Sequence, residues 1–135
     1  RRRMSAESAL YALLTAAAPV TALVGARIYP VVAPEGTPTP LIAYELVSNT
    51  RQPRIDALAS AHLARARVTV NLVSADHAVV KTLRAAVVAA CQFQRGAIAG
   101  VSVVSVIPDF DGPVGFDGAL GLFSQGVDFM VTLFE

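Results

Sequence analysis

A chain of 135 residues, of which 54% are hydrophobic and 16% are charged, is long enough to fold as one domain that buries about 65–70% of its surface. This low charged fraction would leave an isolated subunit with more uncharged surface than solubility favours, so we expect other subunits to cover part of it. The net charge of +1 argues against a free DNA-binding domain, because tight non-specific binding neutralises on the order of 6–10 phosphates, although a ring of copies could still present a charged lumen.

The N-terminal segment begins with three arginines and continues with an apolar run, an order that also occurs in secretory signal peptides. Glu7 interrupts this run, and Leu10, Leu13 and Leu14 fall on one helical stripe, which favours an amphipathic surface helix. No stretch of the sequence approaches the roughly 20 apolar residues of a membrane span. We interpret residues 1–4 as an N-terminal extension of a single domain that spans residues 1–135.

The first third of the sequence predicts a helix, a short helical turn, an extended traverse and a strand. Ser5 can cap a helix over residues 6–17 that Pro19 ends, and Pro19 suits the start of a turn that continues over residues 20–24. The segment ARIYPVVAPEGTPTP contains four prolines, so we expect it to be extended and to lack regular structure. Residues 41–49, LIAYELVSN, are rich in branched and aromatic side chains and predict the first full strand.

The stretch from residue 62 to residue 92 predicts a strand, a turn and a helix around which the rest is arranged. In the strand, small or apolar residues alternate with polar ones, the two sets being Ala64, Ala66, Val68, Val70 and Leu72, and Arg65, Arg67, Thr69 and Asn71. This period of two is typical of a half-buried strand. Ser74 and Asp76 can cap the helix, whose apolar residues recur at helical spacing. We expect the helix to cover the apolar face of the strand and to leave the other face in water.

Two long connections are the strongest candidates for contacts with partner molecules. Residues 50–61 join the first two strands, and residues 109–121 join strands at 98–107 and 122–134, where Gly126 suggests a bulge. Connections of about a dozen residues are uncommon in compact domains and are usually functional or disordered. The element order predicts an α+β fold with a four-stranded, mainly antiparallel sheet and helices packed on one face, in the order α-β-β-α-β-β.

The residue types that carry catalysis or bind metals do not form a recognisable motif. His62 and His77 lack the spacing of a metal site, and Cys91 lacks a paired base, so we interpret the cysteine as a buried structural thiol. As the only cysteine, it excludes an intrachain disulfide and a cysteine-based zinc site, and it favours a cytosolic origin. The sequence contains no G-x-S-x-G elbow, P-loop or dinucleotide-binding fingerprint. We therefore predict neither an enzyme nor a cofactor site.

Three aspartates near glycines, Asp109, Asp111 and Asp117, come closest to a cation site. A calcium loop needs a further short-range ligand and a terminal glutamate, and both are missing here. The preferred interpretation is a turn in which aspartate side chains bond to the backbone.

Four arginines, Arg51, Arg54, Arg65 and Arg67, would form a basic face if the connection at residues 50–61 lies near the central strand. In a monomer, the simpler interpretation is a solvated face on which Glu45 and Asp128 are cross-strand partners of the strand arginines. In a ring, each arginine is repeated around the axis, and ion pairs at the interfaces lose water. With Asp109, Asp111 and Asp117, these arginines are our candidate subunit-interface or lumen residues.

From about Met4 to Glu135, the sequence resembles a known family. The resemblance is carried by V-x-A-L-V-G-x-R-I-Y-P at residues 20–30, the proline-rich traverse and P-L-I-A-Y at residues 40–44. It continues in A-R-V-T-V-N-L at residues 66–72 and V-D-F-M-V at residues 127–131. These features are similar to those of the tail-completion and tail-terminator proteins of siphophages, prophages and gene transfer agents.

The resemblance implies a structural virion protein of the neck, assembled in the bacterial host cytoplasm. Such a protein forms a homo-hexameric ring that ends the major tail tube and joins it to the head-side stopper or connector protein. DNA would pass through the lumen with transient, non-specific contacts, and no membrane would be involved. A dimeric small-ligand or regulatory α+β binding module is the alternative from a different functional class.

Overall fold

A computed structural model describes residues 6–52 and 63–134 of the chain. Four strands are long: β2 (Leu41–Gln52), β3 (Leu63–Ser74), β5 (Val101–Asp111) and β7 (Leu122–Phe134). Three are short: β1 (Ile28–Pro30), β4 (Gly96–Ile98) and β6 (Gly115–Asp117). The helices are α1 (Ala6–Ala16), α2 (Ala18–Val24) and α3 (His77–Cys91).

All of these strands belong to one mixed sheet of seven strands, ordered β1-β2-β3-β7-β5-β4, with β6 paired to β7. β1 runs parallel to β2, and the other pairs are antiparallel. The expected α+β fold with a four-stranded, mainly antiparallel sheet in the order α-β-β-α-β-β is therefore wrong. The prediction missed three strands of three residues each, which are too short to show a period of two and form because a long strand beside them offers free backbone groups.

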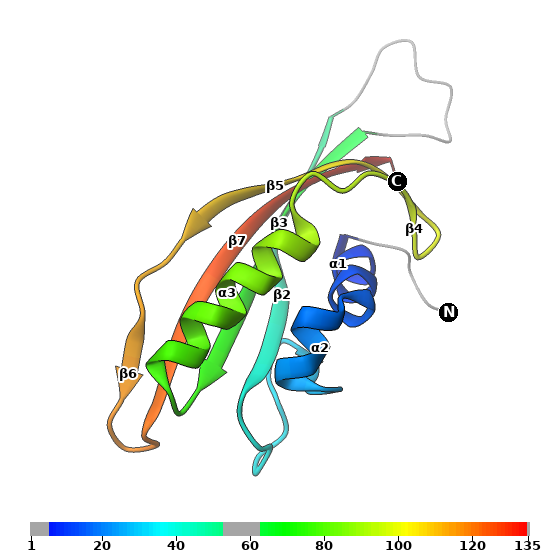
Figure 1. The fold of residues 1–135 in the computed structure, drawn as a ribbon. Coiled ribbons are helices and arrows are strands. Elements are labelled where there is room, and N and C mark those ends of the chain that lie inside the picture. Colours follow the sequence, from blue (N-terminus) through cyan, green and yellow to red (C-terminus); the bar gives the residue numbers. More distant parts are fainter. Residues whose placement is uncertain (1–5, 53–62, 135) are drawn as a thin grey trace.

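The three helices lie on one side of the sheet, with α3 running along β3 and β7 (Figure 1). α1 and α2 are separated at Ala17, and Pro19 stands in the first turn of α2, where a missing N–H is tolerated. Their axes differ by 84°. Among the described residues, no single helix is both long and apolar enough to cross a membrane, and only this bent pair reaches that length together. Ser5, the predicted cap of α1, lies outside the described residues.

The core lies between the helices and the sheet. β3 alternates as predicted: Ala64, Ala66, Val68, Val70 and Leu72 are buried, whereas the residues between them are half-buried or exposed. Phe129, the largest fully buried side chain, contributes to the same cluster from β7. Leu10 and Leu14 of α1 and Leu83 and Val87 of α3 pack against it from the helical side.

The irregularities of the sheet lie in its outer strands. The predicted bulge at Gly126 is wrong, because Gly126 pairs in register with Asn71. The register instead shifts at Val47 in β2, and at Val104 and Asp109 in β5. Gly126 instead allows the side chain of Asn71 to lie close to the backbone of β7, since a Cβ at this position would lie 3.2 Å from Oδ1 of Asn71. Each bulge adds one residue to its strand and changes the side chains that reach the surface.

Candidate functional site

The face of the sheet opposite the helices, here called the open face, is the candidate functional surface. Three rows of paired residues cross it from β2 to β5 through β3 and β7. The rows are Thr50–Arg65–Thr132–Ser105, Ser48–Arg67–Met130–Ile107 and Glu45–Thr69–Asp128–Phe110. All of these residues are half-buried or exposed, so the open face is available to a large partner or to water.

Arg67 is held between two carboxylates at the centre of the open face. Its Nη1 forms ion pairs with Oδ2 of Asp109 and, at 3.2 Å, with Oδ2 of Asp128. The hydroxyl of Thr69 donates a hydrogen bond of 2.7 Å to the other oxygen of Asp128. The hydrogen bond to Asp109, followed by the charges of Asp109 and Asp128, raises the pKa of Arg67 above its ordinary value. The prediction that Asp128 is a cross-strand partner is confirmed, whereas Glu45 forms no ion pair within residues 6–52 and 63–134.

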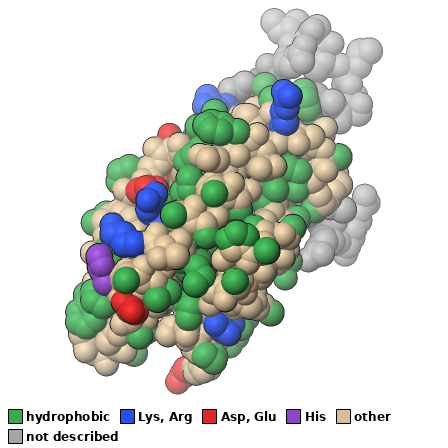
Figure 2. All heavy atoms as spheres, in the orientation of Figure 1, with side chains coloured by type: hydrophobic (Ala, Val, Ile, Leu, Met, Phe, Trp, Pro, Cys, Tyr) green, Lys and Arg blue, Asp and Glu red, His purple; other side chains and the backbone are tan. Residues whose placement is uncertain are grey.

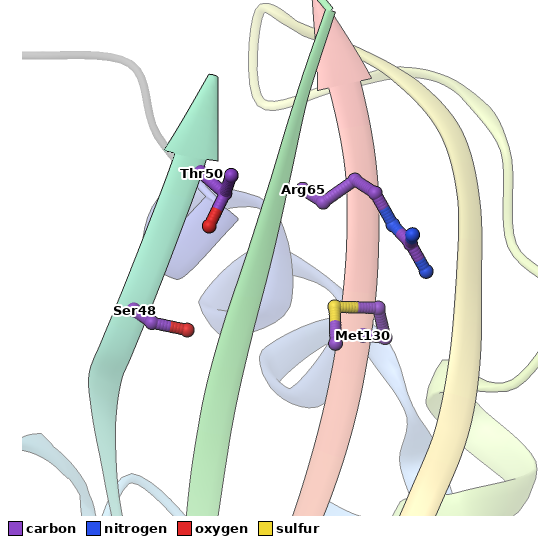
Figure 3. A pocket seen from close by; sticks show the side chains of 4 residues that line it. All are labelled: Ser48, Thr50, Arg65 and Met130. Carbon is purple, nitrogen blue, oxygen red and sulfur yellow. The ribbon is translucent and has the colours of Figure 1, made fainter. Parts of the chain in front are cut away.

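Arg65 lies one row away and is exposed. With Ser48, Thr50 and Met130 it lines a shallow hollow of about 210 Å³. Figure 3 shows the two hydroxyl residues on β2, whereas the Arg65 side chain extends away from them past Met130. The guanidinium and the hydroxyls therefore do not converge on one anion, and the volume is below the roughly 300–1,000 Å³ of ordinary ligand pockets.

The other candidate residues are spread over the molecule. Arg51 is exposed near the end of β2, and Arg54 lies outside the described residues together with the connection at residues 53–61. Asp111 pairs with Arg84 of α3 at 3.1 Å. Asp117 accepts hydrogen bonds from the backbone N–H groups of Ala119 and Leu120 at 3.0 and 3.3 Å, as predicted for a turn stabilised by aspartate.

The three aspartates thus make three separate contacts: Asp109 with Arg67, Asp111 with Arg84, and Asp117 with backbone N–H groups. Within the described part of the chain, no group of three or more His, Cys, Asp or Glu residues could hold a metal ion. The predicted connection at residues 109–121 begins inside β5 and contains β6, which forms a hairpin with β7. Asp117 closes this hairpin, and Phe116 packs on Phe123 with ring centroids 4.7 Å apart.

The thiol of Cys91 and the imidazole of His77 lie at opposite ends of α3 and are not brought together. Cys91 is fully buried, and burial raises the pKa of its thiol to about 12. His77 is exposed and makes an edge contact with the ring of Phe123, and His62 lies outside the described residues. A thiol with this pKa is almost entirely protonated at neutral pH, so Cys91 has a structural role as predicted.

Sequence reasoning missed a set of exposed apolar side chains on the outer strands. On β5 they are Val104, Ile107 and Phe110, here called the β5 flank. At the other margin of the sheet they are Val31, Val32 and Val47, here called the β2 flank. Their exposure depends on the bulges and on the turn after β1, which the period of two does not reveal. On the helical side, Figure 2 shows basic, acidic and hydrophobic side chains interspersed.

One comparison with known proteins identifies a family, and a second shows a shared fold. The model of the family Tail completion protein gp17 matches residues 8–115. A solved chain described as "Virion of native gene transfer agent (GTA) particle" shares the fold, with a TM-score of 0.73 and 18% sequence identity over 97% of this chain and 96% of that chain. A search of curated proteins finds no match. Because the family model covers most of the sequence, the chain belongs to the family of tail completion protein gp17, a structural family of phage tails.

Proposed function

We propose that the chain forms a hexameric ring that ends the tail tube and joins it to the head-side stopper or connector. The observation that carries this proposal is the match of the tail completion family over residues 8–115. The partners would be further copies of this chain, the major tail tube protein and the head-side protein. The ring would lie in the neck of the virion after assembly in the host cytoplasm.

The shape of the subunit suits a ring. A head-to-tail interface uses two different surfaces of the same chain and produces a closed ring when the rotation between neighbours closes. The sheet has two such margins, with β1 and β2 at one side and β5 at the other. The hairpin formed by β6 and β7 lies at one end of the sheet (Figure 1), where it could reach an adjacent layer of the neck.

The open face is the surface that we place toward the DNA. Its described charges are of both signs, because Arg65 and Arg67 share it with Glu45, Asp109 and Asp128. Tight binding to DNA requires many uncompensated cations, and Arg67 is compensated by two carboxylates. A lumen with this surface would allow DNA to pass without retaining it.

Deletion of the gene in the phage or particle that encodes it tests the proposal. We expect full heads and separate tails, with tubes of irregular length, in electron micrographs of the deletion strain. Complementation with the wild-type gene should restore joined particles, and averaged images of the neck should then show a sixfold ring. Joined particles of normal length in the deletion strain would contradict the proposal. The alternative, a small-ligand module, predicts no defect in particle assembly.

A further inference from the structure

We propose that the two flanks of the sheet are the two halves of one contact between copies of this chain. The β5 flank of one copy, Val104, Ile107 and Phe110, would pack against the β2 flank of the next, Val31, Val32 and Val47. This inference rests on the proposed ring and names the surfaces that close it.

The distribution of exposed apolar residues over the sheet motivates the proposal. All six flank residues are between 44% and 74% exposed. The middle of the central strands instead presents charged and hydroxyl side chains on the open face, Arg65, Arg67 and Thr69 of β3 and Asp128 and Thr132 of β7, with the half-buried Met130 between them. Apolar residues of these strands on the same face lie toward the strand ends, and they are Leu63, Val73, Leu122 and Phe134. Sheet margins that remain in water usually carry charged residues that prevent association. Here β5 and the margin at β1 and β2 carry exposed apolar side chains beside charged ones such as Asp109 and Glu45, which is the pattern of margins that become partly buried.

The two flanks lie at matching heights. Val31 donates its N–H to the carbonyl of Tyr44 at 2.7 Å, next to the row Glu45–Thr69–Asp128–Phe110, so Val31 and Phe110 stand near opposite ends of one row. Val47 is the extra residue beside Ser48, whose row ends at Ile107. A rotation about an axis roughly parallel to the strands would therefore bring the apolar residues of one flank to those of the other.

The strand directions are compatible with this contact. Neighbouring strands in the order β2, β3, β7 and β5 are antiparallel, so β2 and β5 of one copy run in opposite directions. A rotation about an axis parallel to the strands keeps each direction. The β2 strand of the next copy therefore runs antiparallel to the β5 strand of the first. Among the described strands, β1 pairs with the outer edge of β2 only as far as Tyr44, and β4 pairs with the outer edge of β5 only as far as Val103. Beyond these two residues, no strand in the described part of the chain pairs with the outer edge of β2 or β5. Pro108 has no N–H, and the carbonyl of Val106 already accepts from Phe93 at 2.7 Å. Side chains, rather than an unbroken backbone ladder, would thus make most of the contact.

The backbone at Val31 is a second, independent observation. Val31 has a φ of 63°, a left-handed conformation that a β-branched residue rarely adopts. Hydrogen bonds from Val31 to Tyr44 and from Val32 to Pro30, both 2.7 Å, hold the turn. The turn presents two consecutive valines to solvent, and such strain is found mainly where function requires it.

Complementary charges at Val47 and Ile107 test the contact. Val47→Glu and Ile107→Lys should each weaken self-association by at least about tenfold, because each places an unpaired charge in an apolar contact. The double variant should assemble again, because every interface then contains a Glu–Lys pair. An equimolar mixture of the two single variants should also assemble, as alternating copies. Analytical ultracentrifugation and native mass spectrometry measure these states, and circular dichroism with thermal unfolding shows that each variant folds.

The matched control is Ala85→Lys, at an exposed position of α3 on the opposite side of the sheet. It should leave self-association unchanged. Single variants that associate like the wild type, or a loss confined to Ala85→Lys, would overturn the inference. If the wild type associates only on the tail tube, the same variants are scored by complementation of the deletion strain, where the single variants should fail and the double variant should restore joined particles.

The two proposals fail in different ways. Normal joining by both single variants, in a strain that needs the gene for joining, would overturn the flank contact and leave the proposed function standing. If the variants show the expected charge-dependent self-association in solution but the deletion strain forms normal particles, the flank contact stands and the proposed function is overturned.

Discussion

The carboxylate of Asp128 on β7 lies 3.2 Å from the guanidinium of Arg67 on β3 and also accepts a hydrogen bond from the hydroxyl of Thr69. Thr69 is the direct neighbour of Asp128 across the strands, whereas Arg67 reaches it diagonally from the row of Met130. One carboxylate thus links two rows of the open face. Asp109, at the bulge of β5, provides the second carboxylate for the same guanidinium.

Replacing Asp128 by Asn should destabilise the fold modestly. The variant keeps the shape of the side chain and leaves Arg67 with Asp109 alone. Since the Arg67 and Asp128 side chains are 30% and 22% exposed, solvent screening keeps the loss of unfolding free energy small. Urea denaturation should show this loss at low salt and a smaller one at about 1 M salt. Arg65→Gln is the control, because no carboxylate of the described residues lies within ion-pair distance of Arg65; equal losses would refute the role of the pair.

Phe129 should be among the most costly residues to truncate. Its side chain is fully buried in the cluster between the sheet and the helices, and Phe→Ala changes in such cores cost about 3–5 kcal/mol. Leu120→Ala, at an exposed position, should change the unfolding free energy by no more than about 0.5 kcal/mol. Thermal and urea unfolding of the two variants measure the contrast, and a difference below about 1 kcal/mol would contradict the assigned core.

The long elements could be predicted from the sequence because their patterns extend over many residues. β3 alternates over twelve residues, and α3 begins after Asp76 as its cap predicts. The strand expected at residues 98–107 was wrong at its start. Ile98 ends β4, and Ala99 and Gly100 form a turn with φ values of 52° and 77° before β5 begins at Val101. Positive φ at both central residues is typical of a tight hairpin, but Ala-Gly is a weak signal for one.

The candidate site was predictable only where it depends on two strands that pair without a bulge, as β3 and β7 do. Asp128 was identified as a partner of the strand arginines because cross-strand neighbours follow from alternation. The contact of Asp109 with Arg67 could not be derived, because it depends on a bulge between Pro108 and Phe110. The same holds for the exposure of Ile107 and Val47. Bulges are decided by the pairing of whole strands, so local sequence does not reveal which side chains they bring to the surface.

Asp76 should contribute to stability through the start of α3. Its side chain accepts a hydrogen bond of 2.9 Å from the N–H of Ala78, and its backbone is extended, as a cap requires. Asp76→Ala should lower the unfolding free energy by about 1 kcal/mol, whereas Asp76→Ser should cost only a few tenths, roughly, because a hydroxyl can accept the same bond. Urea denaturation of both variants distinguishes the cap from a general effect of charge, which would make Ser as costly as Ala.

The buried thiol of Cys91 should make stability fall at alkaline pH. Burial raises the pKa of Cys91 from 9.0 to about 12, so the folded state holds its proton where the unfolded state has lost it. The contribution of the protonated thiol to the free energy of unfolding is therefore complete below pH 9 and is lost as the pH rises toward 12. The slope of this loss is at most about 1.4 kcal/mol per pH unit. Urea denaturation between pH 8 and roughly 10.5 should show a steeper decline for the wild type than for Cys91→Ala, which has no thiol to titrate. The variant will be less stable overall, because it leaves a small cavity, so the difference in slope is the relevant measurement. Parallel slopes, or rapid reaction of the native thiol with a disulfide reagent at pH 8, would show that Cys91 is accessible to solvent.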